Sequence, residues 1–256
     1  MWVRELVKAI AGHVLPNRLL QHVRRRHYYR VLAKGSVDEP ELAVLGLFVK
    51  PGAGAIDAGA NFGLYTKALA ELVGPTGRVY SIEPIPETFD VLTSSVARLG
   101  LRNVVPMRYA VSDSDGVRVR LVVPNVGRFG LENPYRAHIV HGPARGRQVI
   151  AETCTLDSLV IGQARRFAFV KCDVEGHELF CLRGAVDLIR RSRPTWLIEV
   201  SGDPRKSGSS AGSVFDFMGE FGYRAYVVDR NALRPWRLDQ APRVNYFFVP
   251  NGLELG

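Results

Sequence analysis

Cysteine is scarce in this chain of 256 residues, which contains only Cys154, Cys172 and Cys181. An odd number of cysteines without C-x-x-C spacing argues against a disulfide framework, a zinc site and a dithiol redox centre. Long apolar runs are missing too, since none approaches the roughly 20 residues of a membrane span. Residues 1–15 alternate charged with apolar positions, unlike a signal peptide. We therefore expect a protein of the reducing cytoplasm.

Acidic residues are nearly absent from the first 34 positions, which hold eight Lys and Arg residues against the single acid Glu5. This segment carries +7 of the formal net charge of +9 and leaves +2 for the other 222 residues. Apolar residues at helical spacing on both sides of Pro16-Asn17 predict two short amphipathic helices, and we assign residues 1–40 to a basic helical extension. A helical cap with a solvated basic face is the first interpretation. Peripheral contact of residues 1–34 with an anionic membrane is the alternative.

The remaining residues, 41–256, are expected to form one well-buried α/β domain, because 46% of the chain is hydrophobic. Short β-rich runs alternate there with helical stretches, which predicts a mostly parallel sheet covered by helices. The expected strands are residues 55–57, 78–82, 104–109, 167–172, 196–200, 225–228 and 246–249. The expected helices are residues 64–73, 86–99, 178–191 and 211–221.

An insertion interrupts this alternation between Ser114 and Arg166. Residues 117–123 and 148–153 are expected strands that flank the loop PNVGRFGLENPYRAHIVHGPARGR. Loops of this length in compact domains are usually functional or mobile. We therefore predict that this inserted hairpin and loop form the substrate-side wall or lid of a site.

Polar residues stand at the ends of several predicted strands, which is where open α/β sheets bind ligands. Asp57 is followed by Gly59, Asn61 and Gly63, and the glycines permit a tight turn before the free N–H groups of the next helix. Glu83 ends the second strand, 26 residues after Asp57. An acid at this distance past a glycine loop is the usual partner of ribose hydroxyls.

Two further strand ends carry polar groups. Ser112 and Asp113 follow the third strand and are predicted to meet an adenine edge. After the expected strand over residues 167–172, the segment VKCDVEGHE places Asp173, Glu175 and His177 around Gly176. Its last residue, Glu178, is expected to begin a helix, where a negative charge favours the N-terminus.

The cofactor suggested by these acids carries no phosphate. A dinucleotide would require G-x-G-x-x-G directly after the strand, whereas Gly52-Ala53-Gly54 precedes it, and Asp57 and Glu83 would repel a pyrophosphate. A cofactor with a ribose, an adenine and a cationic amino-acid end fits better, and S-adenosylmethionine is that molecule. A nicotinamide oxidoreductase is the less favoured alternative.

Seven segments follow one another in an order typical of one protein family: AIDAGANFGLYT, GPTGRVYSIEPIPETFDVL, YAVSDSDG, TLDSL, VKCDVEGHELFCLRGA, RPTWLIEVS and NYFFVP. Through them the chain, over roughly residues 41–249, resembles an FkbM-type S-adenosylmethionine-dependent methyltransferase. The resemblance implies a Rossmann-like class I methyltransferase fold with seven strands, the last antiparallel, and O-methylation of sugars, polyketides or similar metabolites. It implies Asp57, Gly59, Asn61 and Gly63 as the methionine-side loop, Glu83 as the ribose acid and Asp113 as an adenine contact.

Methyl transfer to an alcohol needs a group that removes the hydroxyl proton near the moment of attack. His177, Asp173 and Glu175 are the candidates. Histidine has an unperturbed pKa near neutrality, and Glu175 either orients it or acts itself. The alternatives are a surface position for His177 and a structural ion pair of the two acids with Lys171 or Arg183.

A divalent ion is a further alternative that we do not expect. Asp173, Glu175 and Glu199 could hold magnesium, which would lower the pKa of the acceptor hydroxyl. Nothing in the sequence fixes the near-octahedral geometry that magnesium requires. We therefore assign no metal residues.

The expected activity is O-methylation of a hydroxyl on a sugar, glycolipid or secondary metabolite. A nucleic-acid methyltransferase is an alternative, but Asn133-Pro134-Tyr135 lies in the insertion and not at the end of the fourth strand, and no basic face with interleaved aromatics runs through the main domain. A non-catalytic cofactor-binding module is the other alternative.

Overall fold

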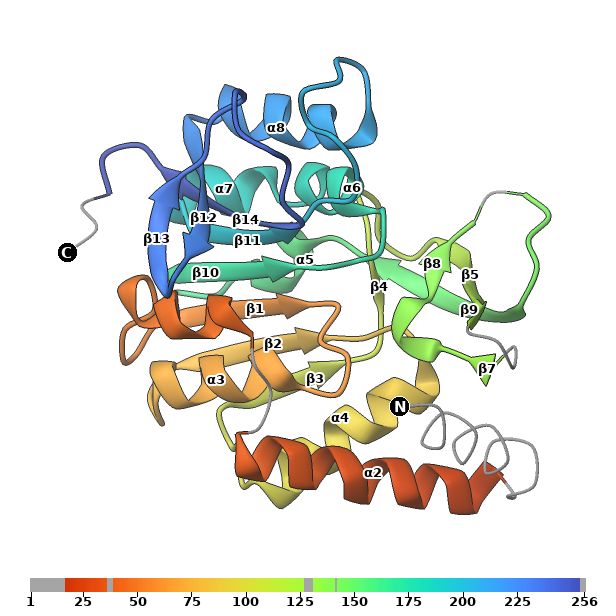
Figure 1. The fold of residues 1–256 in the computed structure, drawn as a ribbon. Coiled ribbons are helices and arrows are strands. Elements are labelled where there is room, and N and C mark those ends of the chain that lie inside the picture. The colour runs from red at the N-terminus through yellow and green to blue at the C-terminus, as the bar shows by residue number, and fades with distance from the viewer. Residues whose placement is uncertain (1–16, 36–38, 127–130, 141, 254–256) are drawn as a thin grey trace.

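The computed structural model describes residues 17–35, 39–126, 131–140 and 142–253. The predicted first N-terminal helix therefore lies outside the described residues. An eight-stranded sheet forms the centre of the molecule, with helices on both of its faces (Figure 1). Its strands in spatial order are β13 (Ala232–Pro235), β12 (Tyr223–Asp229), β14 (Asn245–Pro250), β11 (Thr195–Glu199), β10 (Phe167–Cys172), β1 (Gly54–Ala58), β2 (Arg78–Ile82) and β3 (Val104–Met107).

The predicted seven strands are all present, and the last one, β14, runs antiparallel between β11 and β12 as expected. The pairs from β11 through β10, β1 and β2 to β3 are parallel. The eighth strand, β13, returns antiparallel to β12 through a turn in which Arg230 and Asn231 have φ angles of 50° and 61°. The sheet is therefore that of a class I methyltransferase with an added edge strand.

Two apolar cores lie on opposite faces of the sheet because successive strand residues point to opposite sides. Ile56 of β1 and Val170 of β10 join one core with four helices, and Ala55 and Phe169 join the other with an α-helix and a 3-10 helix. Burial on both faces explains the continuous apolar runs of these strands. The covering elements are η1 (Pro40–Leu47), α3 (Leu64–Val73), α4 (Pro86–Arg98), α5 (Leu156–Val160), α6 (Glu178–Arg183), α7 (Val186–Ser192) and α8 (Ser210–Glu220).

The prediction of one helix over residues 178–191 is wrong, because α6 and α7 are separated at Gly184. A Cβ at Gly184 would lie 2.1 Å from the carbonyl oxygen of Ser112, so only glycine lets the two backbones pass. The carboxylate of Asp157 then accepts two backbone N–H groups at the start of α7, at 3.0 and 2.7 Å. This cap comes from a distant segment and leaves no trace in the local periodicity.

The insertion forms a small sheet of its own beyond the carboxyl ends of the parallel strands (Figure 1). The chain leaves the main sheet after Met107, so the expected strand over 104–109 is shorter than predicted. It joins the insert at Ala110, after two intervening residues. Ile85, at the start of α4, packs into the core of the insert and connects it to the main domain. The insert contains β4 (Ala110–Val111), β5 (Arg118–Val123), β6 (Asn125–Val126), β7 (Leu131–Glu132), η2 (Pro134–Arg136), β8 (His138–Ile139) and β9 (Arg147–Cys154).

The N-terminal helix α2 (Asn17–Lys34) packs along α4. Arg25 forms an ion pair with Asp90 of α4, with its Nε 2.8 Å from Oδ2. The ring of Tyr28 stacks on Phe62 with centroids 4.5 Å apart, which brings α2 onto the turn that follows β1. Over the part of the chain that the structure describes, no helix is long and apolar enough to cross a membrane.

Candidate active site

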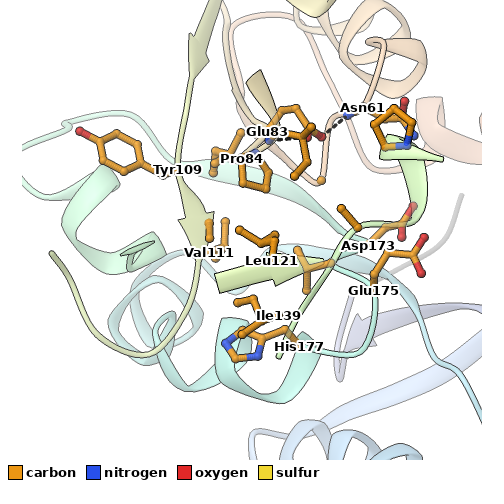
Figure 2. A pocket seen from close by; sticks show the side chains of 17 residues that line it. Asn61, Glu83, Pro84, Tyr109, Val111, Leu121, Ile139, Asp173, Glu175 and His177 are labelled. Carbon is orange, nitrogen blue, oxygen red and sulfur yellow. Dashed lines mark hydrogen bonds between the residues drawn. The ribbon is translucent and has the colours of Figure 1, made fainter. Parts of the chain in front are cut away.

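A pocket lies at the carboxyl ends of β1, β2 and β10, where the insert faces the main sheet (Figure 2). These strands are parallel neighbours, so the loops that follow them converge at one edge. The wall of the pocket brings together six of the site residues predicted from the sequence: Gly59, Asn61, Glu83, Asp173, Glu175 and His177.

The turn after β1 places backbone groups at the pocket. Gly59 has a φ of 76°, and a Cβ at this position would lie 1.8 Å from the carbonyl oxygen of Asp173, so the turn and the β10 loop touch through their backbones. Asn61 also has a positive φ, 54°, and its backbone N–H donates to Glu83 Oε2 at 3.1 Å. The turn is therefore held by both neighbouring strand ends.

Glu83 lies directly after β2 and points into the pocket (Figure 2). Its Oε1 accepts the N–H of Ile85 at 2.9 Å, and its Oε2 accepts that of Asn61. Burial outweighs these bonds and raises the pKa of Glu83 to about 7. Because a carboxylate offers about four acceptor sites, the two backbone bonds leave room for two further donors.

Asp57, predicted as a cofactor contact, is fully buried behind the pocket and does not line it. Its Oδ2 accepts the hydroxyl of Thr66 on α3 at 2.6 Å, and its Oδ1 lies 4.0 Å from Lys171 Nζ. Burial raises the pKa of Asp57, and the charge of Lys171 opposes this shift. Gly63, the N-cap of α3 with a φ of 98°, does not line the pocket either.

Ser112 and Asp113 do not line the pocket that they were predicted to serve. Ser112 is buried and its Oγ lies 3.0 Å from His177 Nε2, while Asp113 is exposed. The pocket is lined instead by the residues just before them, of which Tyr109 and Val111 are the largest. The chain turns into β4 here, so the apolar positions face the pocket and the serine faces α6.

Asp173 and Glu175 stand together on the wall formed by the β10 loop (Figure 2). Asp173 accepts a hydrogen bond from Lys171 at 2.8 Å, so the predicted ion-pair alternative is realised for this acid. Glu175 is half-buried with a φ of 53°. Burial, and next the charge of Asp173, raise the pKa of Glu175.

His177 is only 7% exposed, so its placement on the surface, the alternative considered from sequence, is wrong. It stands immediately before α6, and its ring stacks on Phe180 with centroids 4.3 Å apart. Together with the contact to Ser112, this stacking fixes the orientation of the imidazole at one end of the pocket (Figure 2). Glu178 begins α6 as predicted and accepts the N–H of Gly176 at 2.9 Å.

The acids considered as an alternative magnesium site, Asp173, Glu175 and Glu199, do not form a metal-binding arrangement in the described part of the chain. Among the residues that the structure describes, no group of three or more His, Cys, Asp or Glu side chains is placed to hold a metal ion. Glu199 lies at the end of β11, where burial and then the charges of Asp173 and Glu175 raise its pKa to about 7. The three cysteines are free and buried.

Sequence reasoning missed the apolar part of the pocket. The insert contributes Leu121, Pro134, Ala137 and Ile139, in agreement with the prediction that this segment forms a wall. The individual residues were not identified, because the sequence does not distinguish an apolar residue that faces a core from one that faces a ligand. The useful signal was the length of the insertion.

The family model for the methyltransferase FkbM domain matches residues 57–225, which contain every site residue discussed above. The chain belongs to the FkbM methyltransferase family. The pocket residues lie within the matched FkbM domain, and the class I fold is the one expected of that family.

Two curated proteins are similar to parts of this FkbM chain. The hexuronic acid methyltransferase AglP of Haloferax volcanii is 31% identical over 136 residues, which cover 52% of this chain and 50% of AglP. A protein-L-isoaspartate O-methyltransferase of Aeropyrum pernix is 43% identical over 56 residues, 22% of each chain. The matches thus span half or less of these relatives' length.

Two solved structures resemble the FkbM chain at low sequence identity. Methyltransferase FkbM from Methylobacillus flagellatus superposes with a TM-score of 0.48 and 16% identity, covering 88% of this chain and 59% of that one. A putative rRNA methylase from Clostridium thermocellum superposes with a TM-score of 0.49 and 13% identity, covering 85% and 99%.

Proposed function

We propose that this FkbM protein transfers the methyl group of S-adenosylmethionine to a hydroxyl oxygen of a sugar, carried by a glycolipid or another small glycosylated acceptor. The observation that carries the proposal is the meeting of two unlike walls in one pocket. Glu83 and the turn at Gly59 and Asn61 form the first wall, and the apolar side of the insert forms the other. Similarity to a hexuronic acid methyltransferase supports a sugar as acceptor.

The first wall suits the donor. When bound, S-adenosylmethionine supplies an electrophilic methyl group on a sulfonium. The free acceptor sites of the Glu83 carboxylate suit the two ribose hydroxyls. Ile85 and Val111 also line the pocket and offer an apolar surface for the adenine ring, and the turn at Asn61 suits the amino-acid end.

The β10 loop holds the candidates for the proton acceptor, namely Asp173, Glu175 and His177. Glu175 suits this role best, because it lines the pocket, is half-buried and has a pKa raised toward the operating pH. The carboxylate of Asp173 already accepts a hydrogen bond from Lys171, which makes it a weaker candidate. The contacts of His177 with Ser112 and Phe180 suit a residue that shapes the acceptor end of the pocket.

An acceptor screen tests the proposed activity. The protein is incubated with methyl-labelled S-adenosylmethionine and fractions containing glycolipids, glycosylated metabolites, uronic acid sugars or RNA, and the products are identified by mass spectrometry. We expect label on a sugar oxygen as an ether that survives mild alkali. Label lost as a methyl ester would move the reaction to a carboxylate, and label in an amine or a nucleic acid would contradict the proposal. Cofactor binding without transfer to any fraction would identify a binding module.

A chelation experiment tests the proposal that no metal takes part. We expect the transfer rate to be unchanged after EDTA treatment, because the described acids at the site form no metal-holding group. Loss of activity that added magnesium restores would overturn this part.

We also propose that the outer face of α2 contacts an anionic membrane, which would bring the pocket to a lipid-linked acceptor. The helix contains no acidic residue. Arg26, Arg30 and Lys34 of α2 are exposed, as are Leu19 and Val23, which are 46% and 49% exposed. A basic face with apolar side chains is the pattern of helices that lie on anionic lipid.

Vesicle sedimentation tests this contact. We expect the protein to bind vesicles containing phosphatidylglycerol and not pure phosphatidylcholine. Changing the three exposed basic residues of α2 to Glu should weaken binding by at least roughly 100-fold, at about 1 kcal/mol per charge. The control changes Arg102, Arg190 and Arg224 to Glu, which are exposed outside α2. Equal loss in both variants, or binding to RNA in place of vesicles, would contradict the proposal.

A further inference from the structure

Lys171 is a buried cation just behind the pocket. It is the second-last residue of β10 and only 6% exposed, and the other residues of the strand are apolar apart from Cys172. Lysine is rarely buried without partners, because an uncompensated buried ammonium costs several kcal/mol. Its partners therefore explain why a lysine stands here.

The ammonium group of Lys171 joins four elements. Its Nζ donates to Asp173 Oδ2 in the β10 loop at 2.8 Å and to the carbonyl oxygen of Gly59 in the β1 turn at 3.2 Å. Asp57 Oδ1 of β1 lies 4.0 Å away, and the ring centroid of Tyr65 on α3 lies 5.2 Å away. The partners on β1 and α3 are behind the pocket, whereas Gly59 and Asp173 line it.

The two loops that meet at this ammonium also touch directly. The missing Cβ of Gly59 leaves the space into which the carbonyl oxygen of Asp173 fits, 1.8 Å from the ideal Cβ position. Lys171 thus lies where the turn proposed to hold the donor meets the β10 loop, which carries the candidate proton acceptors. A small change here would alter the position of the turn relative to this loop, and an in-line displacement is sensitive to such a change.

The carboxylates around Lys171 favour its charged form. Burial by itself lowers the pKa of Lys171, but the nearby carboxylates of Asp173 and Asp57 outweigh it, and the pKa is raised. The ammonium therefore stays charged throughout the neutral range.

We propose that Lys171 is a positioning residue for methyl transfer, whose buried ammonium holds the Gly59 turn on the donor side against Asp173 on the acceptor side. The proposal rests on the proposed function, which assigns the Gly59 turn to the donor and the β10 loop to the proton acceptor. Lys171 does not line the pocket and acts through the Gly59 carbonyl and the Asp173 carboxylate. Without it, the carbonyl loses a donor and the carboxylate is free to turn.

A double variant separates positioning from simple stability. Lys171→Met with Asp57→Asn removes the ammonium and one carboxylate charge together, so the cluster keeps a net charge of one negative unit. Asp57→Asn alone is the matched control, since it retains the bonds of Lys171 to Gly59 and Asp173. Affinity for S-adenosylmethionine is measured by calorimetry, and exchange of backbone amides by mass spectrometry.

We expect the double variant to bind S-adenosylmethionine about tenfold more weakly than the control, as loss of charged hydrogen bonds predicts. Amides of residues 57–63 and 172–177 should exchange faster, with other segments unchanged. Equal affinity and equal exchange in the two variants would overturn the proposal. Lys171→Gln, whose amide is uncharged and one atom shorter than the ammonium arm, repeats the test if the double variant does not fold, and unchanged loop exchange would again overturn the proposal. Failure of the proposed function would be distinguished by the same calorimetry, because the wild-type protein would then bind no S-adenosylmethionine.

Discussion

The two walls of the pocket are built in different ways. The wall at β1 and β2 consists of strand ends whose backbone conformation is special, with Gly59 and Asn61 at positive φ and Glu83 held by two backbone N–H groups. The wall of the insert consists of apolar side chains, such as Leu121 and Ile139, on a small sheet with its own core. We infer that the first wall is sensitive to backbone changes, while the second tolerates exchange of side chains.

The largest expected effect is that of Gly59→Ala. The added methyl group would overlap the carbonyl oxygen of Asp173, so we expect loss of detectable S-adenosylmethionine binding and destabilisation by more than about 3 kcal/mol. Gly116→Ala is the control, because Gly116 has a similar φ of 71° with open space around it. It should cost about 1 kcal/mol and leave binding intact. Thermal unfolding and calorimetry measure both, and equal effects would refute the close approach.

Glu175→Gln should affect the chemical step most. An amide of the same shape removes the proposed proton acceptor, and we expect kcat to fall roughly 100-fold while affinity for S-adenosylmethionine changes less than about threefold. Single-turnover rates with the labelled donor measure this. Unchanged kcat would exclude Glu175 and leave His177 as the base.

Glu83→Gln should weaken the donor complex by roughly tenfold to a hundredfold, because charge-assisted bonds to the ribose are lost. In the wild type, affinity should rise as the pH increases through about 7, where Glu83 ionises, and level off above it. The variant should lack this dependence. Calorimetry at about five pH values on both sides of neutrality measures the affinity of the wild type and of the variant. Parallel pH curves would contradict the assigned role.

The same titration has a consequence for stability. Burial raises the pKa of Glu83 from its ordinary value of 4.5 to about 7, so the folded chain binds this proton more tightly than the unfolded chain. The contribution of Glu83 to the free energy of unfolding therefore falls as the pH rises between these values and is constant above them. Chemical denaturation of wild type and Glu83→Gln should differ in slope over this window.

His177→Ala should lower turnover about tenfold with S-adenosylmethionine still bound, since the imidazole shapes the acceptor end of the pocket. Ser112→Ala removes its hydrogen-bond partner and should reproduce part of this loss. Steady-state rates and calorimetry on both variants provide the measurement. Full activity of His177→Ala would remove this residue from the mechanism.

The smallest expected effect belongs to the insert. Leu121→Ala and Ile139→Ala remove apolar contact surface from the wall and widen the pocket. We expect the acceptor KM to rise several-fold, at about 1 kcal/mol for the lost contact, with donor affinity unchanged. Ile150→Ala, in the same small sheet but 63% exposed, is the control. A larger effect on the donor than on the acceptor would reverse the assignment of the two walls.

Local sequence signals were sufficient for the order of the seven predicted strands, whereas η1, α5 and β13 were not predicted. Apolar runs and glycine turns identified the strands of the main sheet, and helices such as α3 and α4 begin and end where periodicity placed them. The break at Gly184 was missed, because its causes, a close backbone approach and the cap from Asp157, come from segments far away in the chain. The apolar lining of the pocket was missed for the same reason.

Asp57 and Glu83 show most clearly what each level decides. The sequence by itself determined the strands, the turns and an acid at each strand end. Only the tertiary structure decided which acid faces the pocket. Asp57 is still within β1, paired with Lys171 and Ser81, so its side chain points into the domain toward Thr66. Glu83 follows the last paired residue of β2, and its carboxylate is therefore free to face the pocket.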